Sequence, residues 1–503
     1  MITKTIKKVL LFIPPAYTFA DAIDINPLPP LGLGYLGAIL EKNGIETKIV
    51  DCLIEGWSDR KRIDDNIIRI GLSFKDIEDI IKRFEPDIVG VNNLFTKQRE
   101  NAHKIYEIAK KVNREIITIA GGAHPTVMPE LVLSDINVDY AVLGEGEESL
   151  MELIEYAEGR RDASSLDGVC FRENGKVRII PKRRFITDLD ALPFPARNLL
   201  KMEKYFGIRQ SHGERRLKRF SPIITSRGCA ALCTFWSAHR VWGRKFRARS
   251  PENVIAEMKH LKDRFCIEEL IFEDDNITLD PKRAEAIFDL MIKEKLDLKW
   301  DTPNGVAAWT LNEKLIDKMK ESGCYKINFA FESGNQYVLD NIIKKPLRID
   351  KVKPLVKYAK SIGLEVGIFL VVGMPSETID QIWDSFYLAK ELEIYTPFIS
   401  VATPYPGTEL FEISKKKGYL KDDFSLDDLY IRSFSISTET FDSFRLRKTL
   451  KEGQSFLIFS YIMRHPLHFI KRIFFKVLLH PLDYVKRLCT YLKEINLKRV
   501  AIH

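Results

Sequence analysis

The sequence predicts an α/β protein built from two strand–helix units and a helical tail. Short apolar strands alternate with amphipathic helices over residues 1–160, a pattern typical of a doubly wound parallel sheet. A proline-punctuated connector follows over residues 161–220. Six further strand–helix repeats over residues 221–410 indicate a partial (β/α) barrel. Residues 411–503 are expected to be helical and basic.

Five apolar segments are the expected strands of the first unit. Glycines and polar residues follow three of them, at 92–93, 121–125 and 144–147. Ligands of such sheets bind outside the carboxyl ends of the strands, so this edge is the predicted binding site. Neither a Gly-x-Gly-x-x-Gly fingerprint nor a phosphate-binding Gly-Lys-Ser/Thr loop is present, which argues against a dinucleotide or a triphosphate. The expected strands are Val9–Ile13, Thr47–Val50, Ile88–Val91, Ile116–Ala120 and Tyr140–Leu143.

The second unit has its polar residues at the same kind of position. Active sites of (β/α) barrels lie at the carboxyl ends of the strands, where acidic and small residues gather in this sequence. The expected strands are Pro222–Thr225, Glu269–Phe272, Lys299–Thr302, Lys326–Phe331, Glu365–Val372 and Phe398–Val401. The expected helices are Pro251–Lys262, Arg283–Lys295, Glu313–Glu321, Val352–Ser361 and Ile379–Leu392.

The net charge of +8 is concentrated in residues 451–503, which hold ten Lys/Arg and three Asp/Glu. Aromatic and aliphatic residues mix there with cations at helical spacing, with breaks at Pro466 and Pro481. Two interpretations stay open: a peripheral contact with an anionic membrane surface, or helices that pack on the catalytic body while Lys and Arg reach water. No apolar run is long enough to span a bilayer, and no nucleic-acid-binding motif accompanies the charge.

Seven scattered cysteines argue against a disulfide framework and predict a cytoplasmic protein, and the membrane interpretation of the tail would place it at the inner membrane face. Two of them, Cys229 and Cys233, lie four residues apart in a glycine-led loop directly after an expected strand. Two thiolates at this spacing predict a soft-metal site, either an iron–sulfur cluster or zinc. Zinc is the weaker interpretation, because two cysteines fill only half of a tetrahedral site.

This loop resembles the cluster loop of the radical S-adenosylmethionine (SAM) enzymes, which reads Cys-x3-Cys-x2-Cys with an aromatic residue before the last cysteine. Cys229, Cys233 and Phe235 match, whereas Trp236 stands at the third ligand position. An indole nitrogen is a donor only, so Trp236 is not a ligand. The nearest substitute is His239, three residues further on.

The resemblance extends along the barrel and implies a binding site for SAM. Carried over by position, the acidic residues after the second strand face the ligand ammonium, and the Glu-Ser pair after the fourth strand faces the ribose or carboxylate. A glycine after the fifth strand leaves room for adenine, and the backbone of Phe235 approaches that base. The implied SAM residues are Phe235, Glu273, Asp275, Glu332, Ser333 and Gly373.

The first unit resembles the cobalamin-binding domain that precedes the radical SAM domain in one large subclass. The matching segments are Pro27–Leu36, Gly121–Glu130 and Gly144–Glu148. An Asp-x-His-x-x-Gly motif is absent, so a protein histidine bound to cobalt is not expected. The alternative interpretation is that the glycines only make tight turns and that His124 caps a helix. The implied cobalamin residues are Gly121, Gly122, His124, Gly144, Glu145 and Gly146.

Two functions from different classes stay open. The first is a cobalamin-dependent radical SAM enzyme. The resemblance implies that it would use a 4Fe-4S cluster, SAM and cobalamin, with flavodoxin or ferredoxin as electron donor. Its reaction would be the methylation or a related modification of an unactivated, lipid-like small molecule. The second is a non-catalytic relative that keeps cobalamin and SAM binding. Trp236 has three explanations: a substitute ligand, a natural loss of the cluster, or an introduced or erroneous substitution, since Cys and Trp codons differ by one base.

Overall fold

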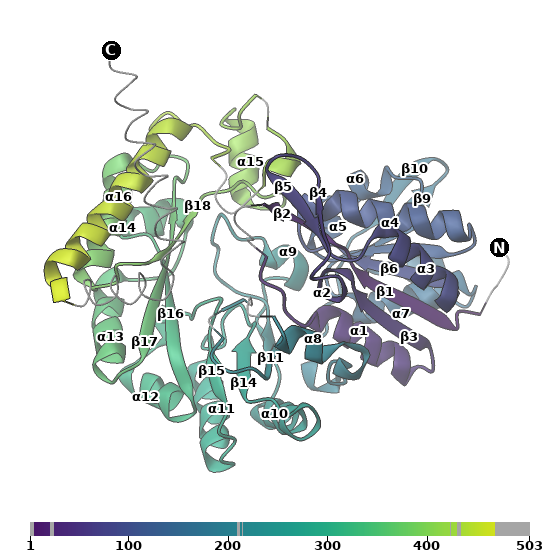
Figure 1. The fold of residues 1–503 in the computed structure, drawn as a ribbon, viewed down its shortest axis with the longest axis horizontal. Coiled ribbons are helices and arrows are strands. Elements are labelled where there is room, and N and C mark those ends of the chain that lie inside the picture. The colour runs from purple at the N-terminus through teal and green to yellow at the C-terminus, as the bar shows by residue number, and fades with distance from the viewer. Residues whose placement is uncertain are drawn as a thin grey trace.

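The computed structural model arranges the chain as two sheet-based units side by side (Figure 1). Purple and blue elements form the N-terminal unit, and teal and green elements form the second unit. The described residues are 5–20, 25–208, 212–213, 215–422, 424–429 and 434–467.

A seven-stranded sheet forms the N-terminal unit, in the order β10-β9-β8-β7-β6-β1-β3. Its strands β3, β1, β6, β7 and β8 run parallel, which confirms the predicted doubly wound sheet. Strands β1, β6, β7 and β8 are short and apolar because helices cover both faces of the sheet, whereas the edge strand β3 is buried only in its last three residues. Their bounds are β1 Lys8–Ile13, β3 Glu46–Asp51, β6 Ile88–Asn92, β7 Ile117–Gly121 and β8 Tyr140–Val142.

Two parts of this unit differ from the prediction. A hairpin of β9 (Val169–Glu173) and β10 (Lys176–Ile180) adds antiparallel to β8, so the sheet extends into the segment expected to be only a connector. A small antiparallel sheet of β2 (Ala16–Phe19), β5 (Ile67–Ile70) and β4 (Arg60–Arg62) was also not expected. The charged residues of β4 are all exposed, so they carry no apolar alternation that predicts a strand.

The helices of this unit begin at recognisable signals. Ser73 caps α3 in a capping box with Asp76, and Pro129 opens α6. The helices are α1 Leu31–Lys42, α2 Cys52–Glu55, α3 Phe74–Phe84, α4 Arg99–Val112, α5 Ala123–Val127, α6 Pro129–Leu133 and α7 Gly146–Ala157.

The second unit is a six-stranded, all-parallel sheet in the order β11-β14-β15-β16-β17-β18. All six predicted repeats are present, and β11 and β18 form its two edges, which confirms a partial barrel. The strands are β11 Phe220–Ile223, β14 Glu269–Phe272, β15 Lys299–Asp301, β16 Cys324–Glu332, β17 Glu365–Val372 and β18 Phe398–Val401. The helices between them are α10 Pro251–Phe265, α11 Pro281–Lys293, α12 Glu313–Glu321, α13 Ile349–Ser361 and α14 Ile379–Glu391.

Short elements join the two units. The two-stranded ladder β12 (Ser226–Arg227) and β13 (Arg247–Ala248) closes the base of the cysteine-bearing segment. Helix α9 (Ala238–Trp242) lies within that segment and contacts α5 of the N-terminal unit. Figure 1 shows α9 between the two sheets. Helix α8 (Met202–Phe206) belongs to the connector.

The C-terminal region packs on the barrel. Helix α15 (Glu409–Lys416) precedes α16 (Ser443–Arg464), which lies along α14. Gly453 of α16 allows this contact, because a Cβ there would lie 2.2 Å from the ring of Phe386. The helix ends before Pro466, as predicted, whereas the break expected at Pro481 lies outside the described residues. No helix in the described part of the chain is long and apolar enough to cross a bilayer.

Candidate functional site

The carboxyl edge of the N-terminal sheet contains the predicted cobalamin residues. Gly121 ends β7, and a Cβ built on it meets nothing within 4 Å, so open space lies beside this residue. Gly122 has φ 102° and ψ −171°, a region that glycine alone adopts readily. A Cβ at Gly122 would lie 2.5 Å from Oδ1 of Asn92, so this glycine is required by the fold itself.

His124 is buried at this edge in α5. Its Nδ1 lies 3.1 Å from Oγ1 of Thr96, and its Nε2 has no hydrogen-bond partner among the described residues. Burial lowers the pKa of His124 to about 4, so the imidazole is neutral at physiological pH. A buried polar atom without a partner is a position that a polar ligand could complete. The edge therefore fits cobalamin through Gly121, Gly122 and His124.

Gly144, Glu145 and Gly146 contact other parts of the fold, while their role beside cobalamin stays a prediction. A Cβ on Gly144 would lie 2.9 Å from the carbonyl oxygen of Val241 in α9, and one on Gly146 would contact Leu36 of α1 at 3.4 Å. The Glu145 carboxylate is fully buried and accepts hydrogen bonds from residues of the barrel and the connector. These three residues therefore join elements of the fold, and the Glu145 carboxylate is already occupied.

The cysteine-bearing segment places two thiols close to the carboxyl edge of the barrel. Cys229 is buried and accepts a hydrogen bond from Nδ2 of Asn276 at 3.3 Å. Cys233 is partly buried, and burial raises the pKa of both thiols, that of Cys233 to about 11. Trp236 is 45% exposed and Phe235 packs against the core.

A third protein ligand for a cluster is not gathered beside these thiols. Within the described residues, no group of three or more His, Cys, Asp or Glu side chains is placed to hold a metal ion. His239 is half-buried in α9, and two neighbouring arginines reinforce the effect of burial in lowering its pKa. The residues present therefore do not fit a cluster held by three protein ligands, with or without His239.

The predicted SAM residues do lie at the carboxyl edge of the second sheet. Oδ2 of Asp275 is buried and has no hydrogen-bond partner in the described chain. Burial, together with the neighbouring Asp274, raises the pKa of Asp275 to about 7. A ligand cation placed here would favour the ionised carboxylate, so the position suits an ammonium group.

Other predicted SAM residues already have partners within the chain. Glu273 accepts from Nδ1 of His212 at 2.9 Å, and Glu332 accepts from Nζ of the buried Lys345 at 2.7 Å. The Ser333 hydroxyl accepts from the backbone N–H of Asn335. A ligand that takes up these carboxylates must share them with His212 and Lys345, or displace those side chains.

Gly373 does not face open space in the direction of its missing side chain. A Cβ there would lie 2.6 Å from Cδ2 of Leu446 in α16. The backbone N–H groups of Gly373 and Met374 donate to Oε2 of Glu377, which is fully buried. Burial raises the pKa of Glu377 to about 8. The room left by Gly373 is thus taken by the C-terminal helix, while its role beside adenine stays a prediction.

Sequence reasoning missed Asn276, Lys345, Glu377 and the arginines of β12 and β13. Asn276 directly follows the predicted SAM residues Glu273 and Asp275, so an amide after acidic residues was a usable signal. Glu377 follows the predicted SAM residue Gly373 by only four residues, so its position at a strand end was also a usable signal. The partners of Lys345 and of the two arginines lie more than ten residues away in the chain, and no local pattern marks them.

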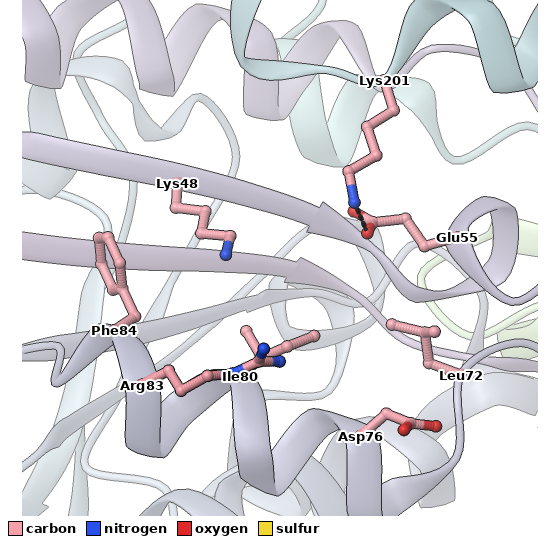
Figure 2. A pocket seen from close by; sticks show the side chains of 8 residues that line it. All are labelled: Lys48, Glu55, Leu72, Asp76, Ile80, Arg83, Phe84 and Lys201. Atoms are coloured by element: carbon pink, nitrogen blue, oxygen red, sulfur yellow. Dashed lines mark hydrogen bonds and ion pairs between the residues drawn. The ribbon is translucent and has the colours of Figure 1, made fainter.

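A separate open pocket of about 470 Å³ lies beside the edge strand β3 (Figure 2). Glu55 and Lys201 form an ion pair across it. None of its lining residues belongs to the predicted cofactor sites. They are Lys48, Glu55, Leu72, Asp76, Ile80, Arg83, Phe84 and Lys201.

Comparisons with known proteins agree with this arrangement. The family model described as B12 binding domain matches residues 26–154, and the Radical SAM superfamily model matches residues 223–389. Cytidylyl-2-hydroxyethylphosphonate methyltransferase of Streptomyces wedmorensis is 36% identical over 458 residues, covering 84% of each chain. An uncharacterized methyltransferase of Pyrococcus horikoshii is 35% identical, covering 81% of this chain and 83% of its own.

Solved structures share the fold. The radical SAM methyltransferase TsrM from Kitasatospora setae, solved with cobalamin and a 4Fe-4S cluster, superposes with a TM-score of 0.65 at 17% identity over 82% of this chain and 79% of its own. The cobalamin-dependent radical SAM enzyme OxsB, solved with aqua-cobalamin and SAM, gives 0.69 at 15% identity over 89% and 66%. The chain belongs to the cobalamin-dependent radical SAM methyltransferase family.

Proposed function

We propose that this chain binds cobalamin at the carboxyl edge of its first sheet and SAM at that of its second, and that it methylates a small molecule held between them. One observation carries the proposal: the cysteine-bearing segment, which follows β11 of the second sheet, contacts the carboxyl edge of the first sheet. Gly144 of the first edge abuts Val241 of α9, and α5 contacts α9. Both ligands would therefore reach a shared space lined by the cysteine-bearing segment.

In this proposal, Gly121, Gly122 and His124 hold cobalamin, which supplies a cobalt centre that carries methyl groups. Asp275 holds the ammonium of SAM, and Glu332 accepts hydrogen bonds from its ribose hydroxyls. An electron-donor protein of the flavodoxin or ferredoxin type remains part of the proposal, because cobalamin and radical SAM chemistry both need electrons. No step is assigned to an iron–sulfur cluster, since the residues supply only two of its three thiolates.

The binding part of the proposal is tested without knowing the substrate. The purified chain is incubated with hydroxocobalamin and gel-filtered, and the corrinoid is measured from its visible absorption. We expect about one corrinoid per chain, and SAM binding with a Kd between about 1 μM and 1 mM by equilibrium dialysis. A chain that emerges without corrinoid would overturn the proposal.

The substrate class is proposed from relatives and from the C-terminal region. Names of similar proteins include a phosphonate methyltransferase and a hopanoid C-3 methylase of Methylococcus capsulatus, the second 23% identical over 402 residues. We propose a hydrophobic small molecule for this chain, because α16 offers an apolar surface that suits a peripheral contact with an anionic membrane. The buried face of α16 packs on the barrel, so the packing interpretation also holds for that face.

The exposed surface of α16 is apolar near the C-terminal end of the helix. Its last two turns and the next residues expose Phe459, Met463 and Leu467, which are 62%, 67% and 76% exposed and spaced four residues apart. The sequence that follows, residues 468–503, has eight Lys/Arg and two Asp/Glu. An apolar face continued by a cationic segment complements an anionic lipid surface.

Phe459→Ser is expected to weaken binding to vesicles that contain anionic phospholipid by about tenfold, because burying a Phe side chain is worth roughly 1.5–3 kcal/mol. Co-sedimentation measures the bound fraction. Phe444→Ser is the matched control, since Phe444 is 76% exposed in the first turn of the same helix, and binding should stay within about twofold. Equal binding by both variants, or no binding by the parent chain, would contradict the contact.

A further inference from the structure

The cysteine-bearing segment is a loop closed at its base. Residues 228–246 leave and return through the ladder of β12 and β13, in which Ser226 pairs with Ala248 and Arg227 pairs with Arg247. Both arginine side chains are almost fully buried, at 3% and 4% exposure. Arg227 is two residues before Cys229, so the position of this base sets the position of the first thiol.

Both arginines bind carboxylates of the N-terminal unit. Nη1 of Arg227 donates to Oε1 of Glu145 at 3.0 Å, and Nη2 of Arg227 donates to Glu147 at 2.5 Å. Nη1 of Arg247 donates to the same Glu145 oxygen at 2.7 Å. Glu145 and Glu147 lie in the loop and the first turn of α7, directly after Gly144 at the proposed cobalamin edge.

The surroundings make these contacts costly to break. The side chains of Glu145 and Glu147 are 0% and 6% exposed, so two buried carboxylates balance two buried guanidinium groups. The guanidinium of Arg227 also lies 5.2 Å from the ring centre of Tyr35 and 5.0 Å from that of Trp242. Removing one member leaves an uncompensated buried charge, which is strongly unfavourable.

We propose that Glu145, Glu147, Arg227 and Arg247, here called the loop clamp, are positioning residues that fix the cysteine-bearing loop against the cobalamin edge. The inference rests on the proposed function for the identity of the ligand at that edge. Because the clamp joins the two elements, a ligand that rigidifies the cobalamin edge also reduces the motion of the loop that faces SAM. Helix α5, which contains His124, also contacts α9 within the loop.

The test compares two carboxylates of the same helix. Glu147→Gln removes one charge from the clamp. Glu152→Gln is the matched control, because Glu152 is also nearly buried in α7 and accepts from Nη2 of Arg184 at 2.7 Å, a residue that does not belong to the loop. Hydrogen–deuterium exchange is measured by mass spectrometry for the full chain, with and without hydroxocobalamin.

In the parent chain and in Glu152→Gln, hydroxocobalamin should slow exchange over residues 117–128 and also over 228–246, by about fivefold or more. In Glu147→Gln, residues 117–128 should be protected as before, while protection of 228–246 falls below about twofold. Without cobalamin, exchange over 228–246 should already be faster in Glu147→Gln than in Glu152→Gln. Arg227→Lys, which keeps the charge but loses the two-pronged guanidinium, should behave like Glu147→Gln.

Equal loop exchange in Glu147→Gln, Arg227→Lys and the parent chain, with or without hydroxocobalamin, would overturn the loop clamp. A parent chain without protection over 117–128 would instead overturn cobalamin binding at that edge. The comparison without cobalamin still judges the clamp in that case, so the two failures are distinguishable.

Discussion

Replacing Trp236 with cysteine is expected to raise the iron bound after anaerobic reconstitution from below about one to about four atoms per chain. Cys229 and Cys233 already supply two thiols on the closed loop, and Trp236 occupies the third family position. Because the Trp236 side chain is 45% exposed, its removal leaves no buried cavity. Iron and sulfide analysis, the electron paramagnetic resonance signal of the reduced protein and SAM cleavage are the measurements.

Ser237→Cys is the matched control, because it adds a thiol one residue further along the same loop. It should bind no more iron than the parent chain, since a cluster depends on ligand spacing. About four irons in the parent chain would show that another group replaces the third cysteine. Little iron in Trp236→Cys would show that these two thiols do not belong to a cluster site.

Gly122→Ala is expected to destabilise the N-terminal unit by about 2–4 kcal/mol, since alanine is strained at φ 102° and its Cβ would overlap Asn92 and Asn93. The neighbouring Gly121 is expected to tolerate a side chain. Gly121→Val should change stability by less than about 1 kcal/mol, because nothing lies within 4 Å of the added Cβ. The valine would instead occupy the space proposed for cobalamin and weaken its binding by at least about tenfold.

Urea unfolding and corrinoid titration of the two variants separate these effects. Loss of stability with Gly121→Val, or unchanged stability with Gly122→Ala, would contradict the geometry of this edge. Unchanged corrinoid affinity in a stable Gly121→Val variant would place the ligand elsewhere.

Local patterns were sufficient for both parallel sheets. Each strand is an apolar run bounded by polar residues, and the alternation with amphipathic helices predicts the order of the elements. The hairpin β9–β10 was missed because residues 161–220 were judged by their prolines, whereas pairing with β8 is what makes Val169–Glu173 a strand. Whether such a segment forms a strand depends on its tertiary contacts.

Local sequence patterns predicted the functional site only in part, for the same reason. Asp275 and Glu332 were placed correctly at a strand end, since the end of each strand is visible in the sequence. Glu145 was assigned to cobalamin because the segment Gly144–Glu148 resembles part of the cobalamin-binding domain. Its partner Arg227 lies 82 residues away, and Leu446 lies almost as far from Gly373 in sequence. Pairings over such separations depend on how the units dock, which no local spacing encodes.

The most direct measurement is an experimental structure of this chain prepared anaerobically with hydroxocobalamin and SAM. We expect the corrin ring over Gly121 and His124 and the SAM ammonium beside Asp275, with both ligands bordering the loop of residues 228–246. A corrinoid bound away from the β7 edge, or SAM bound away from the carboxyl ends of β14 and β16, would contradict it.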